Sequence, residues 1–207
     1  MAKLNVNPNR MELSRLKKRL VVAKRGHKLL KDKQDALIKA FLERAKEAKA
    51  LREDLEKELK DCYNSFLLAR AQTLPVMLEQ ALMISGTRSN LNVSSKNVMS
   101  VVVPEYSVQQ EGSPLNYGLA TSMGSLDVAL ELFSKLLPKL IELAAKEKAI
   151  KLMAKEIEKT RRRVNALEHV MIPSFSETIK YITMKLDEQE RSTLSRLMKI
   201  KEIVRSH

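Results

Sequence analysis

The chain has 207 residues, a formal net charge of +13, one cysteine and no tryptophan. Aromatic residues make up 4% of it and charged residues 30%, a composition typical of long paired helices rather than of a large globular core. A single cysteine excludes a disulfide framework and a cysteine metal site. The amino-terminal residues lack an apolar signal segment, and no apolar run approaches the ~18 residues of a spanning helix. These features predict a cytoplasmic protein, at most peripheral to a membrane.

The positive charge is concentrated in two stretches. Residues 1–33 hold eleven Lys and Arg against two Asp and Glu, and residues 132–163 hold ten against four. Such a field indicates an acidic partner, which the sequence alone leaves open between protein, nucleic acid and membrane surface.

A helical stripe organises the first third of the chain. Steps of three and four residues bring side chains back to one face of an α-helix, and here they connect Leu13, Leu16, Leu20, Ala23, His27, Leu30, Gln34, Leu37, Phe41, Arg44, Ala48, Leu51 and Leu55. The pattern predicts a helix from about residue 8 to 71, with Asn7 as its N-cap and Pro8 as its first residue. A helix of this length needs a partner of similar length to cover its stripe.

Polar residues interrupt the stripe at His27, Gln34 and Arg44. Polar residues at core positions of coiled coils fix the register of the two helices, and we predict that role for these three. Gly26, the only breaker inside the pattern, either allows close helix approach or marks a weak point.

Residues 72–124 differ in kind, because four of the five glycines lie there. Residues 74–84 favour a short helix beginning after Pro75. The β-branched residues 97–103 favour a strand, whose partner is either 106–108 or a segment before Lys96. We therefore predict a short β-hairpin within residues 85–120.

Residues 125–207 form a second predicted helix, capped by Ser125. Pro138 and Pro173 lie inside its pattern, and since an interior proline removes a backbone hydrogen bond, we expect a bend near Pro173. The predicted fold class is mainly α: a long antiparallel two-helix coiled coil of the N- and C-terminal helices, with a small irregular head containing the hairpin. Its parts are residues 1–71, 72–124 and 125–207, and the two chain ends should meet at the far tip.

Motifs for catalysis are missing from the sequence. It contains no phosphate-binding loop, no HExxH, no CxxC and no GxSxG. We therefore predict no catalytic, cofactor-binding or metal-binding residues, and no enzymatic activity of the chain by itself.

Three segments resemble the D subunit, the central rotor stalk, of the V-type/A-type rotary ATPases. They are residues 7–38, which contain RGHKLLK, residues 98–106, VMSVVVPEY, and residues 160–201, which contain RRRVNALEHVMIP. The resemblance implies a central rotor shaft that stands inside a hexamer of alternating A and B subunits. It also implies a head that binds the small F subunit and sits on the funnel-like subunit joining the membrane ring. ATP hydrolysis or synthesis in the hexamer would be coupled through the shaft to ion transport.

Two groups of residues are expected to face those partners. Acidic loops of the hexamer should meet the basic residues Lys17, Lys18, Arg19, Lys24, Arg25 and Lys28. The head should face its partners through Leu59, Phe66, Val101, Val103, Phe133 and Leu137. Two other interpretations of the basic coiled coil are a nucleic-acid-binding protein and a free scaffold, although few aromatic residues are available to stack on bases.

Overall fold

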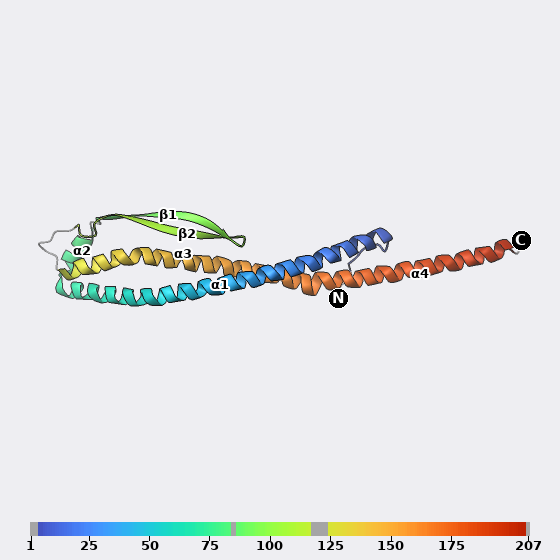
Figure 1. Cartoon of the computed structure of the whole chain (residues 1–207), viewed down its shortest axis with the longest axis horizontal. Helices are drawn as coiled ribbons and strands as arrows, with labels where there is room; N and C mark the ends of the chain where they lie inside the picture. The colour runs from blue at the N-terminus through green and yellow to red at the C-terminus, as the bar shows by residue number, and fades with distance from the viewer. Residues whose placement is uncertain (1–3, 84–85, 117–123, 206–207) are drawn as a thin grey trace. The chain divides into compact units, whose positions relative to one another are not determined.

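The computed structural model describes residues 4–83, 86–116 and 124–205, and the chain divides into two compact units. We call residues 1–36 with 157–207 the terminal unit, and residues 37–156 the hairpin unit. The elements in chain order are α1 (Arg10–Gln72), α2 (Pro75–Met83), β1 (Thr87–Val98), β2 (Val101–Gly112), α3 (Gly124–Ala166), η1 (Leu167–Met171) and α4 (Ile172–Arg205) (Figure 1). Paired long helices with an antiparallel hairpin confirm the predicted fold class.

Asn9, and not Asn7, caps the amino-terminal end of α1. Its side-chain Oδ1 accepts a hydrogen bond from the backbone N–H of Glu12 at 2.7 Å, and its carbonyl accepts one from the N–H of Leu13 at 3.1 Å. A side-chain oxygen that satisfies the third N–H of a helix defines the N-cap. Pro8 therefore lies before the helix, and the predicted capping by Asn7 is wrong.

The core of the terminal unit is a strip of apolar contacts between α1 and α4. Leu16 and Ala23 of α1 are buried against Phe175 and Ile182 of α4. Both pairs are separated by seven residues, which is the spacing that returns a side chain to the seam of a coiled coil. Thr178 is also fully buried; its hydroxyl donates to the carbonyl of Ser174 at 2.7 Å and accepts from the N–H of Leu4 at 3.2 Å.

The hairpin unit is held by α1 and α3, with α2 closing one end. Leu55 and Cys62 of α1 are buried with Leu136 of α3. One heptad further along α1, Ala69 is buried with Leu78 of α2 and Leu126 of α3. The seven-residue spacing from Leu55 through Cys62 to Ala69 is therefore again that of a coiled-coil seam.

The hairpin is longer than predicted, and its turn falls inside the predicted strand. β1 pairs with β2 from Thr87 opposite Gly112 to Val98 opposite Val101. Met99 and Ser100 form the turn with φ of 52° and 70°, which is the left-handed geometry of the common two-residue hairpin turn. The strand predicted over 97–103 is thus wrong, and so is its pairing with 106–108; the segment before Lys96 does form a strand of the hairpin, but it pairs with residues 104–112. Met-Ser carries none of the Asn-Gly signal of such turns.

The C-terminal helix is interrupted at η1, a π-helical turn, whereas Pro138 lies inside α3 without ending it. α3 begins at Gly124, one residue before the predicted cap. The Ser125 hydroxyl donates to the side-chain oxygen of Gln72 at 3.0 Å, so it links α3 to the end of α1. The bend near Pro173 stays a prediction.

Candidate interaction surfaces

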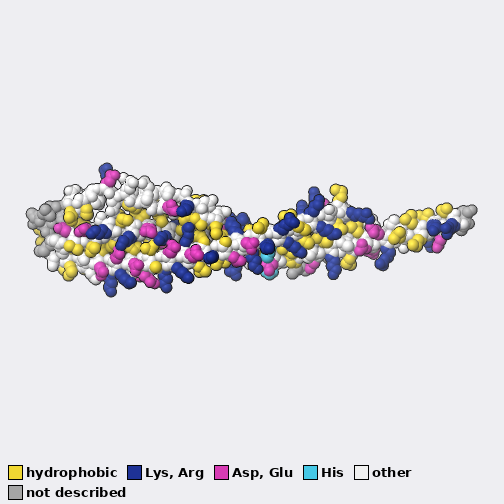
Figure 2. All heavy atoms as spheres, viewed as in Figure 1, with side chains coloured by type: hydrophobic (Ala, Val, Ile, Leu, Met, Phe, Trp, Pro, Cys, Tyr) yellow, Lys and Arg dark blue, Asp and Glu magenta, His cyan; other side chains and the backbone are white. Residues whose placement is uncertain are grey.

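The two units differ in net charge. The terminal unit has twenty-two Lys and Arg against ten Asp and Glu, a net charge of +12, whereas the hairpin unit has sixteen against fifteen. In the space-filling view, dark blue side chains stand out along α1 and α4 of the terminal unit and alternate with magenta ones in the hairpin unit (Figure 2). A partner of the terminal unit should therefore present negative charge.

Six predicted hexamer-facing residues share one property in the structure. Lys17, Lys18, Arg19, Lys24, Arg25 and Lys28 are all exposed. Within the described residues none of the six forms an ion pair, so their charge is not neutralised by the chain itself. Their contact with a hexamer stays a prediction.

The last turns of α4 carry apolar side chains that are exposed to solvent. Leu194, Leu197 and Met198 are each more than half exposed, as are Ile200, Ile203 and Val204. Arg10, the first residue of α1, forms an ion pair with Glu190, and every described residue of α4 beyond Glu190 is exposed. α4 thus extends past α1 (Figure 1). Leu4 lies at Thr178, far along α4 from Arg205, so the described ends do not meet as predicted, and the terminal residues themselves lie outside the described ones. The sequence pattern did not reveal that the apolar side chains of this segment are exposed.

The three polar residues of the α1 stripe lie in different environments. In the terminal unit, His27 Nε2 lies 3.2 Å from Glu168 Oε2, and Gln34 is half-buried. In the hairpin unit, Arg44 is half-buried and lines a groove of about 670 Å³ between the hairpin, α1 and α3. Their control of register stays a prediction.

The predicted partner-facing residues of the head fall into two groups. Leu59, Phe66, Phe133 and Leu137 are half-buried, and the last two line a groove of about 280 Å³ at the root of the hairpin. Val101 and Val103 are buried, with 7% and 5% of their surface exposed. These two valines pack within the chain, so they present no surface to a partner.

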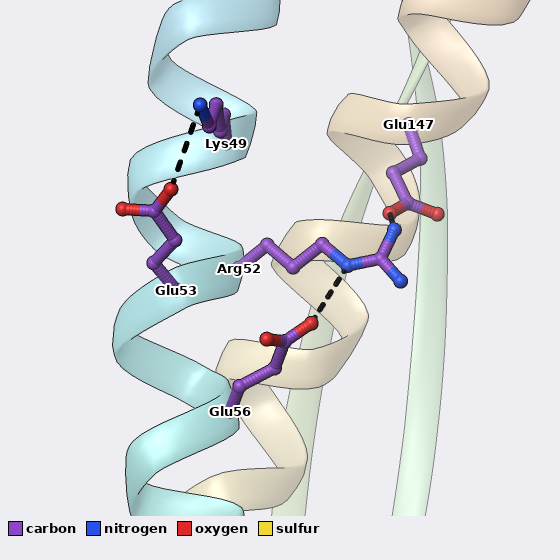
Figure 3. A network of polar contacts seen from close by, with 5 residues as sticks. All are labelled: Lys49, Arg52, Glu53, Glu56 and Glu147. Carbon is purple, nitrogen blue, oxygen red and sulfur yellow. Dashed lines mark hydrogen bonds and ion pairs between the residues drawn. The ribbon is translucent and has the colours of Figure 1, made fainter.

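Charged side chains fasten α1 to α3 in the hairpin unit. Arg52 donates to Glu56 at 3.0 Å on its own helix and to Glu147 of α3 at 3.5 Å (Figure 3). The hydrogen bond to Glu56, followed by the charge of Glu147, raises the pKa of Arg52. Lys139 of α3 reaches Glu58 of α1 at 2.6 Å. Sequence periodicity had not identified these contacts, because they depend on how the two helices are aligned.

In the part of the chain that the structure describes, no three His, Cys, Asp or Glu side chains are grouped so that they could hold a metal ion. No described helix is long and apolar enough to cross a membrane.

A coiled-coil protein with exposed basic and apolar surfaces is the class that this fold defines, and comparison with known proteins gives the family. The model of the family described as the D subunit of ATP synthase matches residues 12–202. Relatives named as the D subunit of V-type ATP synthase include one from Thermoanaerobacter sp. (strain X514), 55% identical over 99% of both chains. Another, from Clostridioides difficile (strain 630), is 52% identical over 99% of this chain and 93% of its own. The chain therefore belongs to the D-subunit family of the V-type/A-type ATPases, the family of the stalk subunit.

Proposed function

We propose that this chain is the central rotor shaft of a V/A-type rotary ATPase. It transmits torque between ATP hydrolysis or synthesis in a catalytic hexamer of A and B subunits and ion translocation in a membrane ring. It performs no catalysis itself, and it acts in the cytoplasm, held at the membrane by its complex. Its hairpin unit meets the small F subunit and the funnel-like subunit of the membrane ring. Family membership and the segregation of +12 charges into one unit support this assignment.

The mechanism depends on the asymmetry of two paired helices. A section through two helices has no threefold symmetry, so each of three catalytic interfaces around it meets a different face. Differential contact of this kind makes nucleotide affinity at each interface depend on shaft angle. By thermodynamic reciprocity, nucleotide occupancy then biases the shaft angle in turn.

The terminal unit is the part proposed to enter the hexamer. Its six exposed, unpaired basic residues on α1 attract acidic loops, and the apolar end of α4 finds cover there. The hairpin unit, with nearly balanced charge, stays outside the hexamer.

Neutralising the basic set tests this assignment. Replacement of Lys17, Lys18, Arg19, Lys24, Arg25 and Lys28 by Gln should weaken assembly with the purified hexamer, most strongly at low salt, because the lost attraction is screened by ions. A matched control replaces six exposed basic residues of the hairpin unit, namely Lys39, Lys46, Lys60, Arg70, Lys148 and Lys151. Equal binding by wild type and the first variant at every salt concentration would contradict the proposal.

The net charge of +12 also favours one alternative, a nucleic-acid-binding coiled coil. A gel shift of duplex DNA and of single-stranded RNA at physiological salt distinguishes the two. Specific retention would favour the alternative, whereas release of both nucleic acids would favour the shaft.

A further inference from the structure

The C-terminal helix of the terminal unit is irregular over one turn. In η1 the N–H of Ile172 donates to the carbonyl of Leu167, five residues earlier, in place of the usual four. Ala166 and Ile172 on either side have ordinary α-helical dihedral angles, so the irregularity is confined to this turn. Only Leu167 of η1 packs, half-buried, against the core of the terminal unit, and the other four residues of the turn are exposed.

Backbone support stays weak just beyond η1. Pro173 has no N–H to donate to a carbonyl of the preceding turn. Ser174 donates its hydroxyl to the carbonyl of Met171 at 2.9 Å, and Ser176 does the same to Pro173 at 2.8 Å. Hydroxyl bonds of this kind recur along α4, at Thr178, Thr183, Thr193 and Ser195. The missing N–H of Pro173 is therefore what sets this turn apart.

Helix α1 is weakened at Gly26. A Cβ atom added at Gly26 would meet no atom within 4 Å outside its own stretch of helix, so close packing does not require a glycine. Glycine in a helix interior is less favourable than alanine, because its backbone loses more freedom on folding. Of the two roles considered for Gly26, the structure favours the weak point.

Among the described residues, one polar contact joins Gly26–His27 to η1. His27 directly follows Gly26, and its Nε2 lies 3.2 Å from Oε2 of Glu168, the second residue of η1. The side chains of this pair are 21% and 50% exposed. The core of Leu16, Ala23, Phe175 and Ile182 fastens the same two helices with buried apolar side chains, whereas the His27–Glu168 contact is polar and partly hydrated.

We propose that Gly26, His27 and η1 form a built-in joint of the terminal unit, where its two helices bend and twist against each other. The His27–Glu168 contact is the fastening that limits this motion. Because a π-turn, a proline and an unrequired glycine occur together across one contact, the compliance of the two helices is concentrated there. This joint is a property of the chain itself and does not depend on the proposed function.

Amide hydrogen exchange on the full-length chain tests the joint. In wild type, protection of residues 26–31 and 167–174 should be at least about tenfold lower than that of residues 16–23 and 175–182. Gly26→Ala should raise protection around residue 26 about fivefold. His27→Ala should lower protection about two- to fivefold on both helices, including η1, which carries its partner Glu168.

Two further variants separate the fastening from a general loss of structure. His169→Ala alters an exposed histidine of the same π-turn and should leave α1 unchanged. Glu168→Ala removes the partner of His27 and should reproduce the effect of His27→Ala on both helices. Uniform protection along both helices of wild type would overturn the proposal, and so would an equal effect of His27→Ala and His169→Ala on α1.

Discussion

The terminal unit and the hairpin unit use the same helix α1 in different ways. In the hairpin unit the charges nearly balance, and Arg52 and Lys139 form cross-helix ion pairs beside the buried seam. In the terminal unit +12 charges accumulate, six basic side chains of α1 have no acidic partner in the described part of the chain, and the end of α4 lies uncovered. Net charge, rather than helix content, distinguishes the two units.

The largest expected effect comes from large-to-small substitutions that leave a cavity in one core at a time. Ile182→Ala in the terminal unit and Leu136→Ala in the hairpin unit each remove a side chain that is at most 3% exposed. Each should lower the free energy of unfolding by about 2–5 kcal/mol, and hydrogen exchange should show the loss mainly in the unit that carries the change. Ile200→Ala, at an exposed site, serves as the control and should cost less than about 0.5 kcal/mol. Equal loss of protection in both units would show that they unfold as one.

A moderate effect is expected at the hairpin turn. Met99 and Ser100 both have positive φ, a region that costs L-residues energy and that Asn-Gly occupies readily. Replacing the pair by Asn-Gly should stabilise the hairpin by about 1 kcal/mol, measured as slower amide exchange across β1 and β2. The control is Leu91→Gly, which completes an Asn-Gly pair with the existing Asn90 inside β1 and should destabilise the hairpin. Loss of protection in the turn variant would contradict the register described here.

The smallest expected effect is a loss of folding stability at alkaline pH, caused by the thiol of Cys62. Cys62 is fully buried, its Sγ donates to the carbonyl of Ala129 at 3.7 Å, and burial raises the pKa of its thiol. The unfolded thiol loses its proton first, so stability is full below the ordinary cysteine pKa and falls as pH rises above it. Urea titrations at neutral and alkaline pH should show this fall in wild type. In Cys62→Ala the fall should be smaller; an identical fall would assign it to other groups.

The sequence pattern predicted the elements held by side-chain periodicity. The stripe from Leu13 to Leu55 was sufficient to predict a long paired helix, because burial repeats with the helical period, as at Leu16, Ala23 and Leu37. The hairpin followed from a local change in composition. These predictions succeeded where many residues point to the same structure.

Features decided by one or two residues could not be predicted in the same way. Asn7 and Asn9 are equally good caps by composition, and only the bond from Glu12 selects between them. The Met99-Ser100 turn has no sequence signal, so the pairing of twelve residues on each side determines it. The π-turn at η1 was likewise not predicted, although a bend was expected near Pro173, two residues after it.

Some properties of the predicted interaction surfaces could likewise be inferred from the sequence, and others could not. Exposure of the six basic residues could be inferred, because a charged side chain off the apolar stripe of a helix faces water. Val101 and Val103 were assigned to a partner, yet they are buried within the chain. A strand sequence does not reveal which face of a hairpin packs against its own protein.

The most direct test of the difference between the units is hydrogen exchange of the chain alone and bound to the purified catalytic hexamer. Residues 17–28 and 191–205 should gain protection on binding, while β1 and β2 keep the exchange rates of the free chain. Protection gained along the hairpin, with residues 17–28 and 191–205 unchanged, would contradict the assignment of the terminal unit to the hexamer.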